Sequence, residues 1–147
     1  MKKWISCLVG TIRQGIWFPV LIFIIHSICA HFFGNLYDLY PPLDIPMHFF
    51  GGVAIAYFSA VFLKQCEIND LITIKSAVLS TILILALTVS AATLWEYAEW
   101  TLDHIFHTQA QKGLDDTLLD TLMGLFGGIL FVVISHGKQI LKELFEK

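Results

Sequence analysis

Four long apolar segments limit what this chain can fold into. They cover about residues 15–33, 46–63, 76–100 and 117–135. A helix of about 20 residues crosses the hydrocarbon core of a bilayer, and backbone polar groups in lipid must bond within their own segment. The pattern therefore predicts an all-α polytopic membrane protein. We expect four transmembrane helices in a compact bundle, with residues 1–147 forming a single membrane domain.

The composition agrees with a lipid environment and argues against several other classes of protein. Of the 147 residues, 56% are hydrophobic and only 14% are charged, whereas soluble domains carry about 25% charged residues. The net charge of −3, with no cluster of Arg or Lys, argues against a nucleic-acid partner. The three cysteines show no CxxC spacing, so they indicate no disulfide framework.

The basic residues predict how the bundle lies in the membrane. Eight of the nine Lys and Arg residues fall near the termini or between the second and third segments, and only Lys112 falls on the opposite side. Because Lys and Arg collect on the cytoplasmic side, we expect both termini in the cytoplasm. The flanking residues 1–14 and 136–147 have the amphipathic pattern of short segments that lie at the membrane interface.

Small residues within the predicted helices indicate close packing. Gly124 and Gly128 form a GxxxG pattern in the fourth segment, and Gly51 and Gly52 are adjacent in the second. Residues of this size let helix backbones approach closely in lipid. The GxxxG pattern therefore predicts either packing within the chain or a homodimer through Gly124 and Gly128.

Six ionisable residues near the ends of three predicted helices are the main candidates for a functional site. They form three pairs with helical spacing: Asp44 and His48, Glu96 and Glu99, and Asp116 and Asp120. The members of each pair share one face of a helix. In the predicted topology all three pairs lie at one depth near the extracytoplasmic surface, so we expect them to converge. Ionisable groups at membrane depth are costly and typically functional.

The chemistry of this set leaves two alternatives open. Glu96 and Glu99 lie near the C-terminal end of their helix, where the macrodipole disfavours negative charge, and neighbouring carboxylates repel. The carboxylates either share protons in a hydrogen-bond network or bind a divalent cation. Mg²⁺, Mn²⁺ or Zn²⁺ suits these donors better than iron, because the Glu-x-x-His motif of di-iron bundles is missing. The candidate metal ligands are His48, Glu96, Glu99, Asp116 and Asp120.

Three motifs carry a family resemblance. The stretches LDIPMHFFGG, LWEYAEW and DDTLLDTLMGLFGG occur in this order and resemble the YjdF-like family of bacterial inner-membrane proteins over about residues 40–130. A more distant similarity is to VanZ-like proteins of the cell envelope. The resemblance implies a multi-pass protein of the bacterial inner membrane, and the distribution of Lys and Arg predicts its site on the extracytoplasmic side. The family-equivalent positions are Asp44, His48, Glu96, Glu99, Trp100, Asp116, Thr117 and Asp120.

Three classes of function fit these features. The first is a protein that binds a lipid headgroup, a lipid-linked envelope intermediate or a cation through Asp44, His48, Trp100 and Thr117. The second is a metal-assisted hydrolase or transferase on a lipid-linked substrate, with Glu96 or Glu99 as catalytic base. The third is a structural bundle in which the polar residues link the helices. The sequence alone does not decide whether the protein is an enzyme.

Overall fold

The computed structural model describes residues 1–31 and 35–145, with side chains up to residue 143, and helices are the only regular secondary structure in this part of the chain. The predicted end of the first span at residue 33 lies outside the described residues. The elements are α1 (Lys2–Gly15), α2 (Trp17–His31), α3 (Leu36–Leu39), η1 (Pro41–Leu43), α4 (Asp44–Ile68), α5 (Ala77–Phe106) and α6 (Leu114–Phe145). The prediction of an all-α fold is confirmed.

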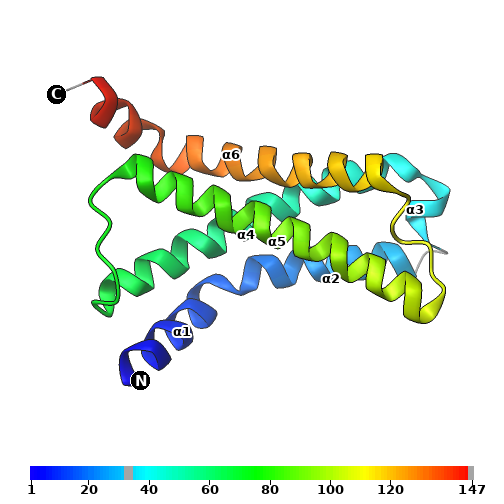
Figure 1. Ribbon diagram of the computed structural model, residues 1–147, viewed down its shortest axis with the longest axis horizontal. Coiled ribbons are helices and arrows are strands. Elements are labelled where there is room, and N and C mark those ends of the chain that lie inside the picture. Colours follow the sequence, from blue (N-terminus) through cyan, green and yellow to red (C-terminus); the bar gives the residue numbers. More distant parts are fainter. Residues whose placement is uncertain (32–34, 146–147) are drawn as a thin grey trace.

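Three helices form the centre of the bundle. Figure 1 shows α4, α5 and α6 running along the molecule, each packed against the other two, with α2 beside α4. Three segments are long and apolar enough to cross a membrane: Pro41–Ile68, Ala77–Phe106 and Leu114–Glu143. All three extend beyond the predicted apolar segments, because helical hydrogen bonding does not stop where the hydrocarbon core ends. In particular, α6 continues past residue 136 as the same helix.

The N-terminal region supplies a fourth span only if two helices are counted together. At about 1.5 Å per residue, the 15 residues of α2 are too short for a core about 30 Å thick. The pair of α1 and α2 passes as one span bent by 53°. The bend lies near Gly15 and Pro19, and proline cannot donate the helical hydrogen bond at its position. The buried residues of α1 are Cys7, Thr11 and Gly15, and Cys7 Sγ lies 3.3 Å from Cys66 Sγ of α4.

Glycines bring the backbones of α4 and α6 into direct contact. A Cβ atom added to Gly52 would collide with the Gly124 carbonyl group, and one added to Gly127 would collide with the Phe49 carbonyl. A Cβ atom on Gly124 would lie 3.2 Å from the Ala92 Cβ of α5. Gly52, Ala92 and Gly124 are therefore the point where the three central helices meet.

The two glycines of the GxxxG pattern pack against other helices of the same chain. Gly124 packs between α4 and α5, and a Cβ atom on Gly128 would lie 3.1 Å from Thr88 Cγ2 of α5. Both glycines are buried in the bundle. The packing corresponds to the intramolecular alternative, and the homodimer through Gly124 and Gly128 stays a prediction.

The two adjacent glycines of α4 give a matched test of this packing. We expect Gly52→Ala to lower the free energy of unfolding by about 1–3 kcal/mol, because the added methyl group overpacks a backbone contact. Gly51→Ala is the control, since its added Cβ atom meets nothing within 4 Å. Unfolding in mixed detergent micelles, followed by tryptophan fluorescence, compares the variants. Equal stability of the two would contradict this account of the packing.

Candidate cation site

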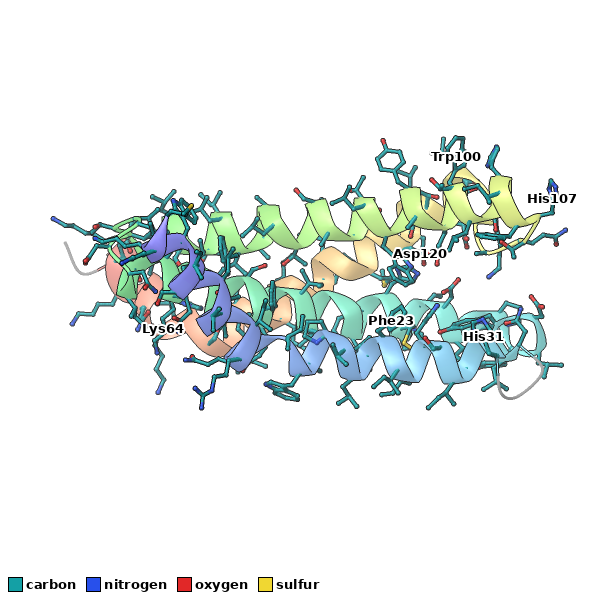
Figure 2. The ribbon with its side chains drawn as sticks, turned by 90° about the horizontal axis from the view of Figure 1, so that it is seen from below. Phe23, His31, Lys64, Trp100, His107 and Asp120 are labelled. Carbon is teal, nitrogen blue, oxygen red and sulfur yellow. The ribbon has the colours of Figure 1, made fainter. Side chains whose placement is uncertain are left out.

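The three central helices bring four carboxylates and one imidazole together near one end of the bundle. We call this set the carboxylate–histidine cluster: Asp44 and His48 of α4, Glu96 and Glu99 of α5, and Asp120 of α6. It lies toward the end that carries α3 and the α5–α6 loop. Figure 2 shows Asp120 inside the bundle, with Trp100 and His107 near the same end and Lys64 at the opposite end.

The close packing of small residues explains why the cluster forms. His48, Glu96 and Asp120 each lie four residues from one of the small residues where the helices meet, Gly52, Ala92 and Gly124. Residues four apart lie one above the other on a helix face. The three polar side chains therefore converge one turn along the bundle from the contact between the three helices.

His48 is the centre of the cluster. Its Nε2 atom lies 3.4 Å from Asp44 Oδ1 and 3.7 Å from Asp120 Oδ2, and its Nδ1 atom lies 3.8 Å from Glu96 Oε1. These distances exceed the usual range of about 2.7–3.2 Å for N–H···O hydrogen bonds. The separation of two ligands on one cation is about 3–3.5 Å for metal–ligand bonds near 2.0–2.1 Å. The 3.4 Å distance lies in this range, and the distances of 3.7 and 3.8 Å are slightly longer.

The buried carboxylates differ in how their oxygens are satisfied. The Glu96 side chain is 4% exposed, and neither of its oxygens accepts a hydrogen bond of ordinary length from the described residues, although the Thr117 side chain lies nearby. Glu99 accepts a hydrogen bond from Trp95 Nε1 at 2.8 Å. Asp120 is 2% exposed. Burying a carboxylate without partners costs free energy. Glu96 is therefore the member of the cluster that a neighbouring positive charge would stabilise most.

Two groups of the described residues have the geometry of a metal site. Asp44, His48 and Asp120 form one, and His48, Glu96 and Glu99 form the other, with the ligand atoms of each group within 4.8 Å of one another. His48 belongs to both. A metal-bound histidine usually donates its second N–H to a carboxylate. A cation on Nδ1 beside Glu96 and Glu99 would leave Nε2–H facing Asp44.

The remaining predicted site residues lie around the cluster. Asp116 belongs to neither metal group, and its carboxylate accepts a hydrogen bond from the Lys112 backbone N–H at 3.1 Å. The Thr117 hydroxyl accepts one from Gln111 Nε2 at 2.9 Å. Trp100 is half exposed and its ring contacts the tilted ring of His104, with ring centroids 4.1 Å apart. The structure thus brings five of the eight predicted residues together and places Asp116 and Trp100 outside them. Thr117 lies at the edge of the cluster, with its side chain near Glu96.

Two polar contacts near the cluster are not indicated by the sequence motifs. Lys112 Nζ lies 3.3 Å from Asp44 Oδ2. Partial burial lowers the pKa of this ammonium, but the Asp44 carboxylate more than offsets the effect and leaves the pKa raised. Tyr37 Oη lies 2.8 Å from His26 Nδ1, and the His26 ring contacts Trp95 edge to face. In the sequence, Lys112 stands out only as the one basic residue on its predicted side of the membrane.

The fold and the site define a small polytopic membrane protein with a buried ionisable cluster between its helices. Residues 12–139 match the family described as predicted membrane protein (DUF2238), and the chain belongs to this family. The YjdF-like resemblance agrees with this assignment. The VanZ-like resemblance stays a prediction.

One relative is informative about length. An uncharacterized protein of Thermotoga maritima is 35% identical over 117 residues, which cover 78% of this chain and 58% of that protein. The chain therefore matches less than two thirds of its relative's length. No solved structure matches the chain.

Proposed function

We propose that the carboxylate–histidine cluster binds a divalent cation, and that this cation holds a lipid headgroup or a lipid-linked envelope intermediate. The observation that carries the proposal is Glu96, whose two buried oxygens lack hydrogen-bond partners among the described residues beside the imidazole of His48. A single proton would neutralise Glu96 but would leave the neighbouring carboxylates of the cluster to repel one another. A cation satisfies both oxygens and the neighbouring carboxylates at once.

The charge of the surroundings supports a cation over an anion as the primary ligand. The four carboxylates of the cluster face one imidazole and, through Asp44, one lysine. An anionic headgroup would be repelled by this set unless a cation lies between them. Carboxylate oxygens with one imidazole nitrogen suit Mg²⁺, Mn²⁺ or Zn²⁺.

The location proposed for the site is the extracytoplasmic half of a bacterial inner membrane. The support is the distribution of Lys and Arg, of which only Lys112 lies at the end that holds the cluster. Reporter fusions after Asn35 and Gln111 should then be active outside the cytoplasm, and a fusion after Asp70 inside it. A cytoplasmic signal at Gln111 would refute this orientation.

Removing the cation with a chelator and then adding a divalent cation back tests the proposed function. Chelator-treated protein in detergent should melt at a lower temperature than untreated protein, because removing a cation leaves mutually repelling carboxylates. A divalent cation at 100 times its Kd should restore about 2.7 kcal/mol of stability, and the same ionic strength of KCl should not. A melting temperature that is indifferent to chelator and to all three of Mg²⁺, Mn²⁺ and Zn²⁺ would contradict the proposal.

A further inference from the structure

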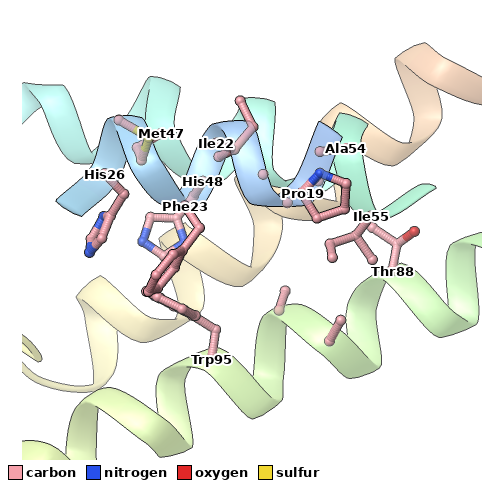
Figure 3. A pocket seen from close by; sticks show the side chains of 15 residues that line it. Pro19, Ile22, Phe23, His26, Met47, His48, Ala54, Ile55, Thr88 and Trp95 are labelled. Atoms are coloured by element: carbon pink, nitrogen blue, oxygen red, sulfur yellow. The ribbon is translucent and has the colours of Figure 1, made fainter. Parts of the chain in front are cut away.

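A groove of about 260 Å³ leads from the cluster into the apolar part of the bundle. It lies between α2 and α5, with α4 and Gly124 of α6 completing its wall. Figure 3 shows His26, His48 and Trp95 at one end of the groove and Pro19, Ile55 and Thr88 toward the other. Apart from the two histidines, the Trp95 ring and Thr88, the described residues that line the groove are apolar, and none of them carries a full charge.

The groove exists because the helices around it carry small residues and α2 stays apart from α5. Gly51, Gly52, Ala91, Ala92 and Gly124 all line it. A Cβ atom added to Gly51 would meet nothing within 4 Å, so this position faces open space. The α2 helix packs along α4, and its ring contacts to α5 are those of Phe23 and His26 with Trp95, beside the cluster.

The dimensions of the groove fit part of one leaflet. The stretch from His48 to Ile55 along α4, like that from Trp95 to Thr88 along α5, covers seven residues, or about 10 Å of helix. One leaflet of the hydrocarbon core is about 15 Å thick, half of the whole core. An apolar groove of this length at this depth is surrounded by acyl chains, which are its most abundant apolar neighbours.

We infer that the groove binds one acyl chain of a glycerophospholipid whose phosphate is held by the cation of the carboxylate–histidine cluster. This inference rests on the proposed function, because without a cation the carboxylates would repel the phosphate. His48 connects the two parts, since it lines the groove and also lies within 4 Å of Asp44, Glu96 and Asp120. The chain lies against the small residues, and the headgroup lies at the polar end.

Photo-crosslinking in vesicles tests the position of the chain. The probe is a phosphatidylglycerol with a diazirine in the middle of one acyl chain, in vesicles of phosphatidylethanolamine and phosphatidylglycerol. Labels should concentrate on groove residues such as Ile22, Ile55 and Ala91. Gly51→Leu should lower this labelling about tenfold, the factor given by about 1.4 kcal/mol of lost binding free energy. Ala91→Leu, which fills the groove from α5, should have the same effect.

Gly137→Leu is the matched control, because its added side chain also enters open space on a helix but lies outside the groove. Its labelling should equal that of the unmodified protein. Unchanged labelling in both Gly51→Leu and Ala91→Leu would overturn the inference, as would labels spread evenly over the lipid-facing surface. Cation binding in Gly51→Leu should be unchanged. A failure of the groove inference can therefore be distinguished from a failure of the cation site.

A second probe tests the role of the phosphate. A diacylglycerol with the same diazirine chain but no phosphate should label the groove about tenfold less than the phospholipid, equivalent to about 1.4 kcal/mol. In Glu96→Gln, phospholipid labelling should fall to the level of diacylglycerol. Equal labelling by the two probes in the unmodified protein would overturn the phosphate contact. Protein that binds no cation, whatever its labelling, would instead refute the proposed function.

Discussion

Replacing His48 by alanine is expected to lower the free energy of unfolding by about 3–5 kcal/mol, the range seen when one partner of a buried charge pair is removed. The imidazole, 10% exposed, lies within 4 Å of carboxylates from all three central helices. Its removal leaves Asp44, Glu96 and Asp120 facing one another and takes away the only nitrogen ligand of either metal group. Denaturation in mixed micelles measures the change.

His104→Ala is the control for this variant. His104 is exposed, and its ring Nδ1 lies 2.8 Å from the Trp100 carbonyl oxygen, away from the cluster. Its substitution should change the stability by no more than about 0.5 kcal/mol, as at most surface sites. If His48→Ala were as stable as His104→Ala, the imidazole would not compensate the carboxylates and the account of the cluster would be wrong.

Glu96→Gln and Asp120→Asn are expected to weaken divalent-cation binding by at least about 100-fold. Each substitution keeps the shape of the side chain but replaces a charged oxygen ligand by a neutral amide. Changes to groups that only support a metal ligand already cost about 10–100-fold in affinity, so a lost ligand should cost at least as much. Titration calorimetry of chelator-treated protein with Mn²⁺ or Zn²⁺ gives the affinities.

Asp115→Asn provides a matched control for the charge change. Asp115 lies on the same helix as Asp120 and close to the same end of the bundle, but its side chain is exposed. Its cation affinity should stay within about twofold of the unmodified protein, because exposed charges are screened by solvent and salt. Equal losses in Asp115→Asn and Asp120→Asn would point to a diffuse electrostatic effect instead of a bound cation.

The stability of the amide variants separates the two chemical alternatives that the sequence left open. If the cluster were a protonated hydrogen-bond network, Glu96→Gln would keep donors and acceptors while removing a charge. Such a variant would fold as well as the unmodified protein and show no change in cation dependence. In the cation site, the same variant loses the stabilisation by added cation and becomes indifferent to chelator.

The apolar segments and the spacing of the polar pairs were sufficient to predict much of the fold. His48 follows Asp44 by four residues, and residues four apart share one face of an α-helix. The rotation of each helix about its axis was not predictable from these pairs alone. It is fixed by the contact between Gly52, Ala92 and Gly124, and the sequence shows these residues only as small ones among many.

Other features depend on packing between segments that are distant in the sequence. Asp116 has the same helical spacing to Asp120 as Asp44 has to His48, yet its carboxylate accepts a hydrogen bond from the Lys112 backbone N–H of the preceding loop and belongs to neither metal group. The bend between α1 and α2 replaces a single straight first span. Trp95 binds Glu99 through an i,i+4 contact that the spacing allowed but did not require.

The metal content of the purified protein tests the central claim most directly. Protein extracted in detergent without chelator and washed free of loose ions should contain close to one equivalent of a divalent metal by elemental mass spectrometry. The Glu96→Gln/Asp120→Asn double variant, purified in parallel, should contain almost none, and Asp115→Asn should match the unmodified protein. Unmodified protein that is free of metal and takes up no Mg²⁺, Mn²⁺ or Zn²⁺ on dialysis would contradict a cation site in this cluster.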